Sequence, residues 1–143
     1  MLEVVNFTRQ RIEKKFFEKI VKNVLKSEKK EKQKVSVFLV GEKRIKDLNK
    51  KYKKKNKSTD VLSFGEVSNF IEPEKKRLGE IVICLEKVKK NARKYKNPFK
   101  KELARVLIHG ILHLLGYNHE KSTKEEKKMR SKEEYYLSKL FKS

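Results

Sequence analysis

The three histidines of the chain lie close together, in the pattern His-x3-His-x2-Gly-x2-His. His109 and His113 are spaced i, i+4, so both imidazoles project from one face of a predicted helix. Gly116 can take the left-handed conformation that ends this helix and turns His119 back toward the pair. Three neutral imidazoles that meet at one metal leave a fourth position for water, which is the arrangement of a catalytic zinc site. The alternative is a pair of core histidines satisfied by Glu102 and backbone carbonyls.

The residue after the first histidine restricts the chemistry. The same spacing occurs in the metzincin zinc proteases, which carry glutamate at this position as the base for the metal-bound water. Here the position is Gly110, so a peptidase interpretation meets the ligand pattern but lacks the base. Phosphodiester cleavage suits such a site better, because a metal lowers the pKa of bound water to about 7 and stabilises charge on the phosphorane.

One strongly apolar helix is predicted to carry the first two histidines. Between residues 98 and 115, after two lysines, the polar side chains are Glu102, Arg105, His109 and His113. At about 3.6 residues per turn these four form one narrow stripe. A helix that is apolar on its other sides is buried, so the stripe must face a cavity or a partner.

The charge of the chain indicates its class of partner. Only 36% of residues are hydrophobic, and 40 Lys plus Arg against 19 Asp plus Glu give a net charge of +21. This excess attracts polyanions, and we expect nucleic acid rather than a membrane. A thermophile's lysine-rich composition is the alternative, but ion-pair networks need both signs of charge.

Other sequence features predict a single cytoplasmic domain over residues 1–143. The apolar segments suit one core, and the chain has neither a signal-peptide core nor an apolar run long enough to span a bilayer. The single cysteine, Cys84, excludes an internal disulfide. It lies in a strand-like apolar run, so we expect a buried thiol rather than a metal ligand.

Apolar periodicity predicts the secondary structure. Strands are expected over residues 2–7, 35–40, 59–64 and 78–84. Helices are expected over residues 8–27 with Thr8 as N-cap, 42–52, 85–95, 98–115, and from 122 or 123 to 141. The pattern predicts an α+β (mixed α/β) fold, in which about five helices, among them a metzincin-like metal helix, cover a small mixed sheet of about four strands.

Three sequence blocks resemble the YbeY family of rRNA maturation factors, which are metal-dependent endoribonucleases specific for single strands. The blocks are residues 59–64 (TDVLSF), 78–84 (LGEIVIC) and 109–119 (HGILHLLGYNH), and Met129 and Glu133 match the C-terminal pattern of the family. The resemblance in block order covers essentially the whole chain. It implies one zinc ion on His109, His113 and His119, a compact α/β domain, 16S rRNA 3′-end processing and quality control of the small ribosomal subunit.

Two positions depart from the family pattern. Where the family usually has a functional arginine, this chain has Lys53, which keeps the charge and loses the bidentate fork that fits a phosphate. Where the family usually has aspartate before the third histidine, this chain has Asn118, which can orient a ligand but cannot accept a proton as a base. If relatives use that aspartate as base, Glu120 or the metal hydroxide must serve here. Met129 is expected to pack in the core below the metal.

The lysine-rich segment 50–57 is predicted to hold the RNA strand. Lysines bind backbone phosphates and an aromatic ring can stack on a base. A solvated loop is the alternative. The expected substrate contacts are Lys50, Lys51, Tyr52, Lys54, Lys55 and Lys57.

The sequence therefore predicts a zinc-dependent endoribonuclease for single-stranded rRNA, with His109 and Lys53 in catalysis and no DNA substrate. Another divalent transition metal can replace zinc at imidazole ligands. Two alternatives stay open. One is a non-catalytic RNA-binding factor of ribosome assembly with a structural metal, and the other is a metzincin-like metallopeptidase.

Overall fold

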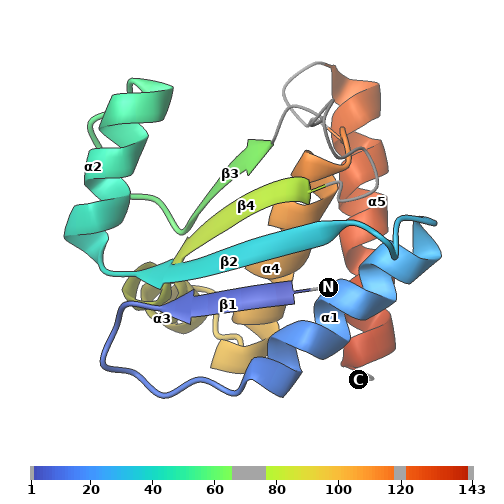
Figure 1. Ribbon diagram of the computed structural model, residues 1–143, viewed down its shortest axis with the longest axis horizontal. Coiled ribbons are helices and arrows are strands. Elements are labelled where there is room, and N and C mark those ends of the chain that lie inside the picture. The colour runs from blue at the N-terminus through green and yellow to red at the C-terminus, as the bar shows by residue number, and fades with distance from the viewer. Residues whose placement is uncertain (1, 66–76, 118–121, 142–143) are drawn as a thin grey trace.

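The computed structural model describes residues 2–65, 77–117 and 122–141 (Figure 1). In these ranges the strands are β1 (Leu2–Asn6), β2 (Lys34–Val40), β3 (Val61–Gly65) and β4 (Arg77–Cys84). The helices are α1 (Lys14–Ser27), α2 (Glu42–Lys53), α3 (Leu85–Lys94), α4 (Phe99–Leu114) and α5 (Thr123–Leu140). The predicted α+β fold, with its four strands and five helices, is confirmed.

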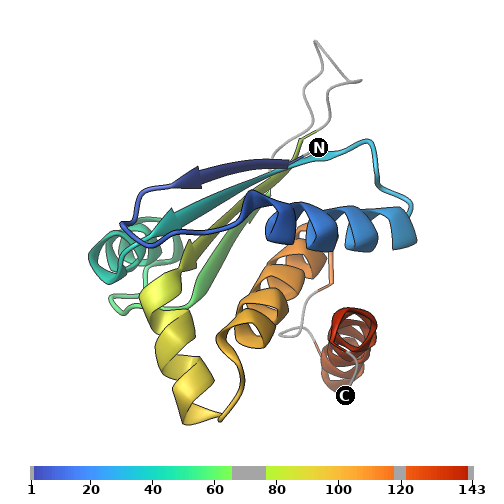
Figure 2. The ribbon, with the colours of Figure 1, turned by 90° about the horizontal axis from the view of Figure 1, so that it is seen from below.

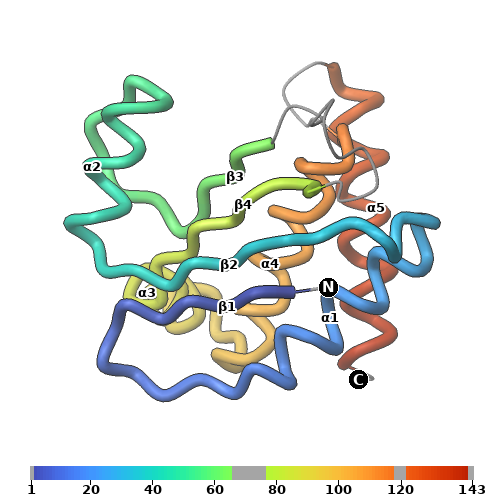
Figure 3. The backbone as a smooth tube through the Cα atoms, in the orientation of Figure 1, coloured from blue at the N-terminus to red at the C-terminus, as the bar shows by residue number. Residues whose placement is uncertain are grey.

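The four strands form one mixed sheet in the order β1-β2-β4-β3. β1 pairs with β2 and β2 pairs with β4 in parallel, whereas β3 pairs antiparallel with β4 and forms one edge. Figure 3 traces these strands beside one another, with β3 next to the long α2–β3 connection. Helix α2 contacts both the edge strand β3 and its neighbour β4.

Successive side chains along each strand point to opposite faces of the sheet, so the core has two parts. Val37, Leu39, Ile81 and Ile83 belong to the main cluster, together with α1 and α4 residues. The side chains between them point to the opposite face. Figure 2 shows α1, α4 and α5 on one side of the sheet. Of the described helices, only α2 packs on the other face, through Ile45.

Cys84 lies in the smaller cluster, as a fully buried side chain packed with Val40, Ile45, Leu62 and Val82. Burial raises the pKa of its thiol, which favours the neutral form. Because α4 packs on the opposite face, the thiol is separated from the histidines. The prediction of a buried thiol is confirmed.

The start of α1 differs from the prediction. The helix begins at Lys14, and Thr8 does not cap it. The Thr8 backbone N–H and hydroxyl both donate to Asn6 Oδ1, at 2.9 Å and 2.6 Å, so Thr8 is held in a turn after β1. The hydrogen bonds to Asn6 thus hold Thr8 in a turn, and the helix begins six residues later. In the part of the chain described, no helix combines the length and apolar character needed to cross a membrane.

Candidate active site

Helix α4 carries the histidine pair and packs closely on the sheet at Gly110. A Cβ atom at this position would lie 3.0 Å from Ile81 Cγ2 and 3.3 Å from Ser63 Oγ. The Ser63 hydroxyl donates to the carbonyl of Gly110 at 3.3 Å. The position that carries the protease glutamate therefore faces the sheet, where a larger side chain would force α4 away. This packing argues against the peptidase alternative.

His109 and His113 lie side by side on α4, as their spacing predicts. Their ring centroids are 4.8 Å apart. Nδ1 of His109 contacts Glu133 Oε1 of α5, in a pair whose side chains are 30% and 16% exposed. Such a carboxylate fixes the ring orientation and the tautomer of a histidine. The sequence interpretation noted Glu133 only as part of a C-terminal pattern and did not predict this role.

Met129 packs beneath the same histidine. It is 2% exposed and lines a small cavity of about 160 Å³ together with His109 and Glu133. Met129 and Glu133 are spaced i, i+4 on α5, so they share one face of the helix. Met129 thus belongs to the core next to His109. Its expected place below a metal stays a prediction. The i, i+4 spacing of Met129 and Glu133 is a signal that could have identified Glu133.

The other half of the polar stripe on α4 pairs a buried carboxylate with a partly exposed arginine. Glu102 is 3% exposed, and Arg105 Nη2 approaches its Oε2 at 3.4 Å. Among the described side chains, that oxygen has no hydrogen-bond donor. The stripe thus runs from a buried carboxylate, paired with a partly exposed arginine, to the two histidines, and the histidine end opens into a cavity.

That cavity, of about 630 Å³, joins three segments that are distant in sequence. His109 and His113 contribute from α4 and Val61, Leu62 and Ser63 from β3. The end of α2 contributes Asn49 and Lys53, and the α2–β3 connection contributes Lys55, Lys57, Thr59 and Asp60. The histidine pair therefore shares one cleft with three lysines and one carboxylate, that of Asp60, and the excess of positive charge favours an anionic ligand.

Asn49 shapes the lysine-rich wall of this cleft. The side chain is 3% exposed, and its amide donates to the Lys57 carbonyl at 3.0 Å. The Asn49 carbonyl accepts from the Lys55 backbone N–H at 3.2 Å, and Lys54 takes a left-handed conformation with φ 57°. These contacts fold the segment back against α2. Asn49 is a positioning residue that the sequence interpretation missed.

The predicted RNA-contacting residues separate into two groups. Lys53, Lys55 and Lys57 line the cleft, whereas Lys50, Lys51 and Lys54 are exposed and are not part of its described lining. Tyr52 lines a different cavity, on the face of the sheet that carries α2. The structure thus brings only part of the predicted segment to the histidines.

The helix ends as Gly116 predicts. Gly116 has φ 102°, its N–H donates to the His113 carbonyl, and the Tyr117 N–H donates to the Leu112 carbonyl. Asn118, His119 and Glu120 lie outside the described residues, so the predicted third ligand has no described position. Within the ranges described, no three His, Cys, Asp or Glu side chains are grouped as a metal would require.

A polar cluster around Glu28 holds the chain just beyond α4. The hydroxyl groups of Tyr117, at 2.7 Å, and of Tyr136 donate to its carboxylate, and Lys132 Nζ lies at 3.1 Å. Burial by itself would raise the pKa of Glu28, but the three donors outweigh it and hold the pKa below its ordinary value of 4.5. The cluster joins α1 and α5 to the segment that leads to His119.

Replacing Glu28 with Gln should destabilise the protein at neutral pH. A lowered carboxyl pKa stabilises the fold above the unfolded pKa, and this contribution is lost as the pH falls through the folded pKa. The difference in unfolding free energy between the wild type and Glu28→Gln should therefore narrow as the pH falls below 4.5. Urea denaturation over a pH series measures it. A difference that is independent of pH would contradict this account of the cluster.

Comparison with known proteins identifies relatives over most of the chain. The family model described as Endoribonuclease YbeY matches residues 3–141. A protein named Endoribonuclease YbeY from Thermodesulfovibrio yellowstonii is 50% identical over 107 residues, which are 74% of this chain and 66% of that protein. One of the same name from Aquifex aeolicus is 45% identical over 109 residues, 76% of this chain and 71% of that protein.

A solved structure has a similar fold. The solution structure of the Thermotoga maritima protein TM1509 superposes with a TM-score of 0.66 at 33% sequence identity. The superposition covers 96% of this chain and 87% of that protein. Similarity in sequence and in fold therefore extends over the elements that form the cleft.

Proposed function

The chain belongs to the YbeY family of endoribonucleases, and we propose that it cleaves single-stranded RNA in the cleft between α4 and the α2–β3 connection. The proposed substrate is the 3′-end region of 16S rRNA on the small ribosomal subunit, and the proposed wider role is quality control of that subunit. Such a substrate implies a cytoplasmic location. The relatives are named as endoribonucleases.

One observation carries the proposal. His109 and His113 line the same cavity as Lys53, Lys55 and Lys57. Ammonium groups attract and hold phosphates, and the histidines stand where a held phosphate would lie. The net charge of +21 supports the same class of substrate over the whole surface.

The residues of the site fit a transition metal. Two adjacent imidazoles are present, and the carboxylate on Nδ1 of His109 is the kind of partner that metal-bound histidines usually have. We infer that His109 and His113, together with His119, hold zinc or another divalent transition metal. When bound, the ion supplies polarisation of a phosphoryl oxygen and activation of water near neutral pH.

The other residues position the substrate and balance its charge. Glu133 holds the His109 ring and keeps a proton on Nδ1. Lys53 places a positive charge in the cavity where negative charge develops during phosphodiester cleavage. Lys55 and Lys57 lie on the same wall and contact the adjoining backbone phosphates. Lysine is a point charge without the arginine fork, so it neutralises the phosphate without fixing its orientation.

A cleavage assay with a labelled rRNA 3′-end fragment tests the proposal. Metal-loaded protein should cleave the single-stranded fragment and leave the same fragment intact when it is annealed to its complement. Removal of the metal with a chelator should stop cleavage, and its return should restore it. If metal-loaded protein binds the fragment in a salt-sensitive manner and does not cut it, the non-catalytic RNA-binding alternative is correct.

A further inference from the structure

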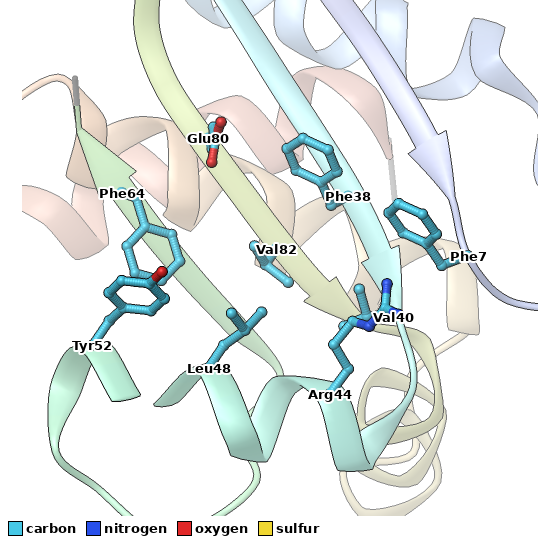
Figure 4. Close-up of a pocket in the computed structure, with 9 residues that line it drawn as sticks. All are labelled: Phe7, Phe38, Val40, Arg44, Leu48, Tyr52, Phe64, Glu80 and Val82. Carbon is cyan, nitrogen blue, oxygen red and sulfur yellow. The ribbon is translucent and has the colours of Figure 1, made fainter. Parts of the chain in front are cut away.

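A second cavity lies on the face of the sheet that carries α2. It has a volume of about 410 Å³, and its floor is formed by Val40, Leu48 and Val82. Figure 4 shows these side chains between α2 and strands β2 and β4, with aromatic rings on either side. The histidine helix packs on the opposite face, so this cavity is separate from the proposed active site.

Two pairs of aromatic rings form its walls. Phe7 and Phe38 are stacked, with centroids 6.4 Å apart and an interplanar angle of 12°. Tyr52 and Phe64 meet edge to face at 5.5 Å. Phe7 and Tyr52 are each 56% exposed, and they are two of the four large hydrophobic side chains exposed among the described residues. Exposed rings around an apolar floor favour a flat, partly apolar ligand.

The charges around the cavity match those of a nucleotide. The Arg44 guanidinium lies 4.7 Å from the Phe7 ring centroid, and Lys53 Nζ lies 5.1 Å from that of Phe64. These cations can reach the phosphates on either side of a base. Glu80 provides a carboxylate in the lining, where it can accept hydrogen bonds from the N–H groups at a base edge. A carboxylate at this place disfavours a phosphate in the cavity itself.

The second cavity and the proposed active site lie on opposite faces of the edge strand β3, and consecutive residues line them. Ser63 lines the histidine cleft, and the next residue on β3, Phe64, lines the aromatic cavity. In the same way, Lys53 lines the cleft and the preceding Tyr52 lines the aromatic cavity. A single RNA strand that crosses β3 beside Lys53 can therefore contact both.

We propose that the aromatic cavity binds an unpaired base of the same RNA strand whose backbone lies in the histidine cleft. The inference rests on the proposed function, because it needs RNA in the cleft. Stacking between aromatic rings requires a base that is free of its partner strand. The cavity thus selects unpaired RNA at a distance from the scissile bond.

The test compares the double variant Phe7→Ala/Tyr52→Ala with Tyr95→Ala. Tyr95 is a matched control: it is also 56% exposed, carries Lys94 Nζ 5.4 Å from its ring centroid, and is not part of the cavity. With a labelled RNA oligomer of about ten nucleotides, the double variant should bind roughly tenfold or more weakly than the wild type. Tyr95→Ala should bind like the wild type. An abasic oligomer of equal length should bind the double variant and the wild type alike.

Salt dependence separates stacking from phosphate binding. The double variant should keep the wild-type slope of log affinity against log salt, whereas Lys57→Ala, in the cleft, should reduce the slope by about one. Thiouridine-substituted RNA provides a second measurement on the unaltered protein. Its photocrosslinks should fall on peptides that contain Phe7, Phe38, Tyr52 or Phe64.

Equal RNA affinity of the double variant and Tyr95→Ala, without crosslinks to these peptides, would overturn the inference. The aromatic cavity would then be assigned as a binding site for a protein segment instead of an RNA base. If the wild type cleaves RNA under these conditions, the proposed function stands without the inference. If binding depends on the cavity and the wild type does not cleave, the proposed function fails and the base site stands.

Discussion

Replacing His109 with alanine is expected to lower the rate of RNA cleavage on the order of a thousandfold. The change removes one proposed metal ligand and leaves the Glu133 carboxylate without its partner. His109 is partly exposed at the cleft, so the fold should survive the truncation. Initial rates on the labelled rRNA 3′-end fragment measure the loss, and metal content and circular dichroism are recorded on the same preparations.

Glu133→Gln is the graded comparison for this experiment. Glutamine has nearly the same shape but no charge, so it should weaken metal binding by about 10- to 100-fold and lower cleavage less than His109→Ala does. Equal cleavage by the wild type and His109→Ala would mean that a contaminating nuclease is responsible. The proposal that this protein cleaves RNA would then be wrong.

Gly79→Ala is expected to destabilise the protein by about 3 kcal/mol or more. Gly79 has φ 153°, and a Cβ atom there would lie 2.4 Å from the Phe64 carbonyl oxygen and 2.7 Å from Leu114 Cδ2. The first of these atoms is backbone of the paired strand, so it cannot move without disturbing the sheet. Urea denaturation followed by circular dichroism measures the change.

Gly65→Ala is the matched control, because Gly65 faces Gly79 in the β3–β4 pair. A Cβ atom at Gly65 meets nothing within 4 Å, so this variant should unfold near the wild-type denaturant midpoint. If the two variants lose similar stability, the close approach at Gly79 is not what requires glycine.

Local patterns predicted most of the elements, because apolar periodicity reports which faces are buried. The error at the start of α1 shows what such patterns omit. Thr8 has the residue type of an N-cap, but the Asn6 side chain two residues earlier captures both of its donors. In the resulting turn the Thr8 hydroxyl oxygen accepts from the Gln10 N–H and not from a helical N–H. Residue type alone does not predict which of these N–H groups it meets.

Only part of the candidate site was predicted, because local patterns do not show how separate segments meet. Spacing on one helix places His109 beside His113, and a run of lysines shows a basic wall. Neither shows which lysines face the histidines, because that depends on the fold of the α2–β3 connection around Asn49. Tyr52 and Lys53 are about 100° apart on α2, so neighbours in sequence line different cavities. A contact between separate helices, such as that of Glu133 with His109, cannot be predicted from the periodicity of either helix alone.

The pairing of His109 with Glu133 also has a consequence for biosynthesis. The two residues are 24 positions apart, and the second lies on the last helix. During translation α4 is therefore synthesised before the carboxylate that orients its imidazole. The nascent chain carries both helical imidazoles without this partner, and the site matures only when the C-terminal helix docks.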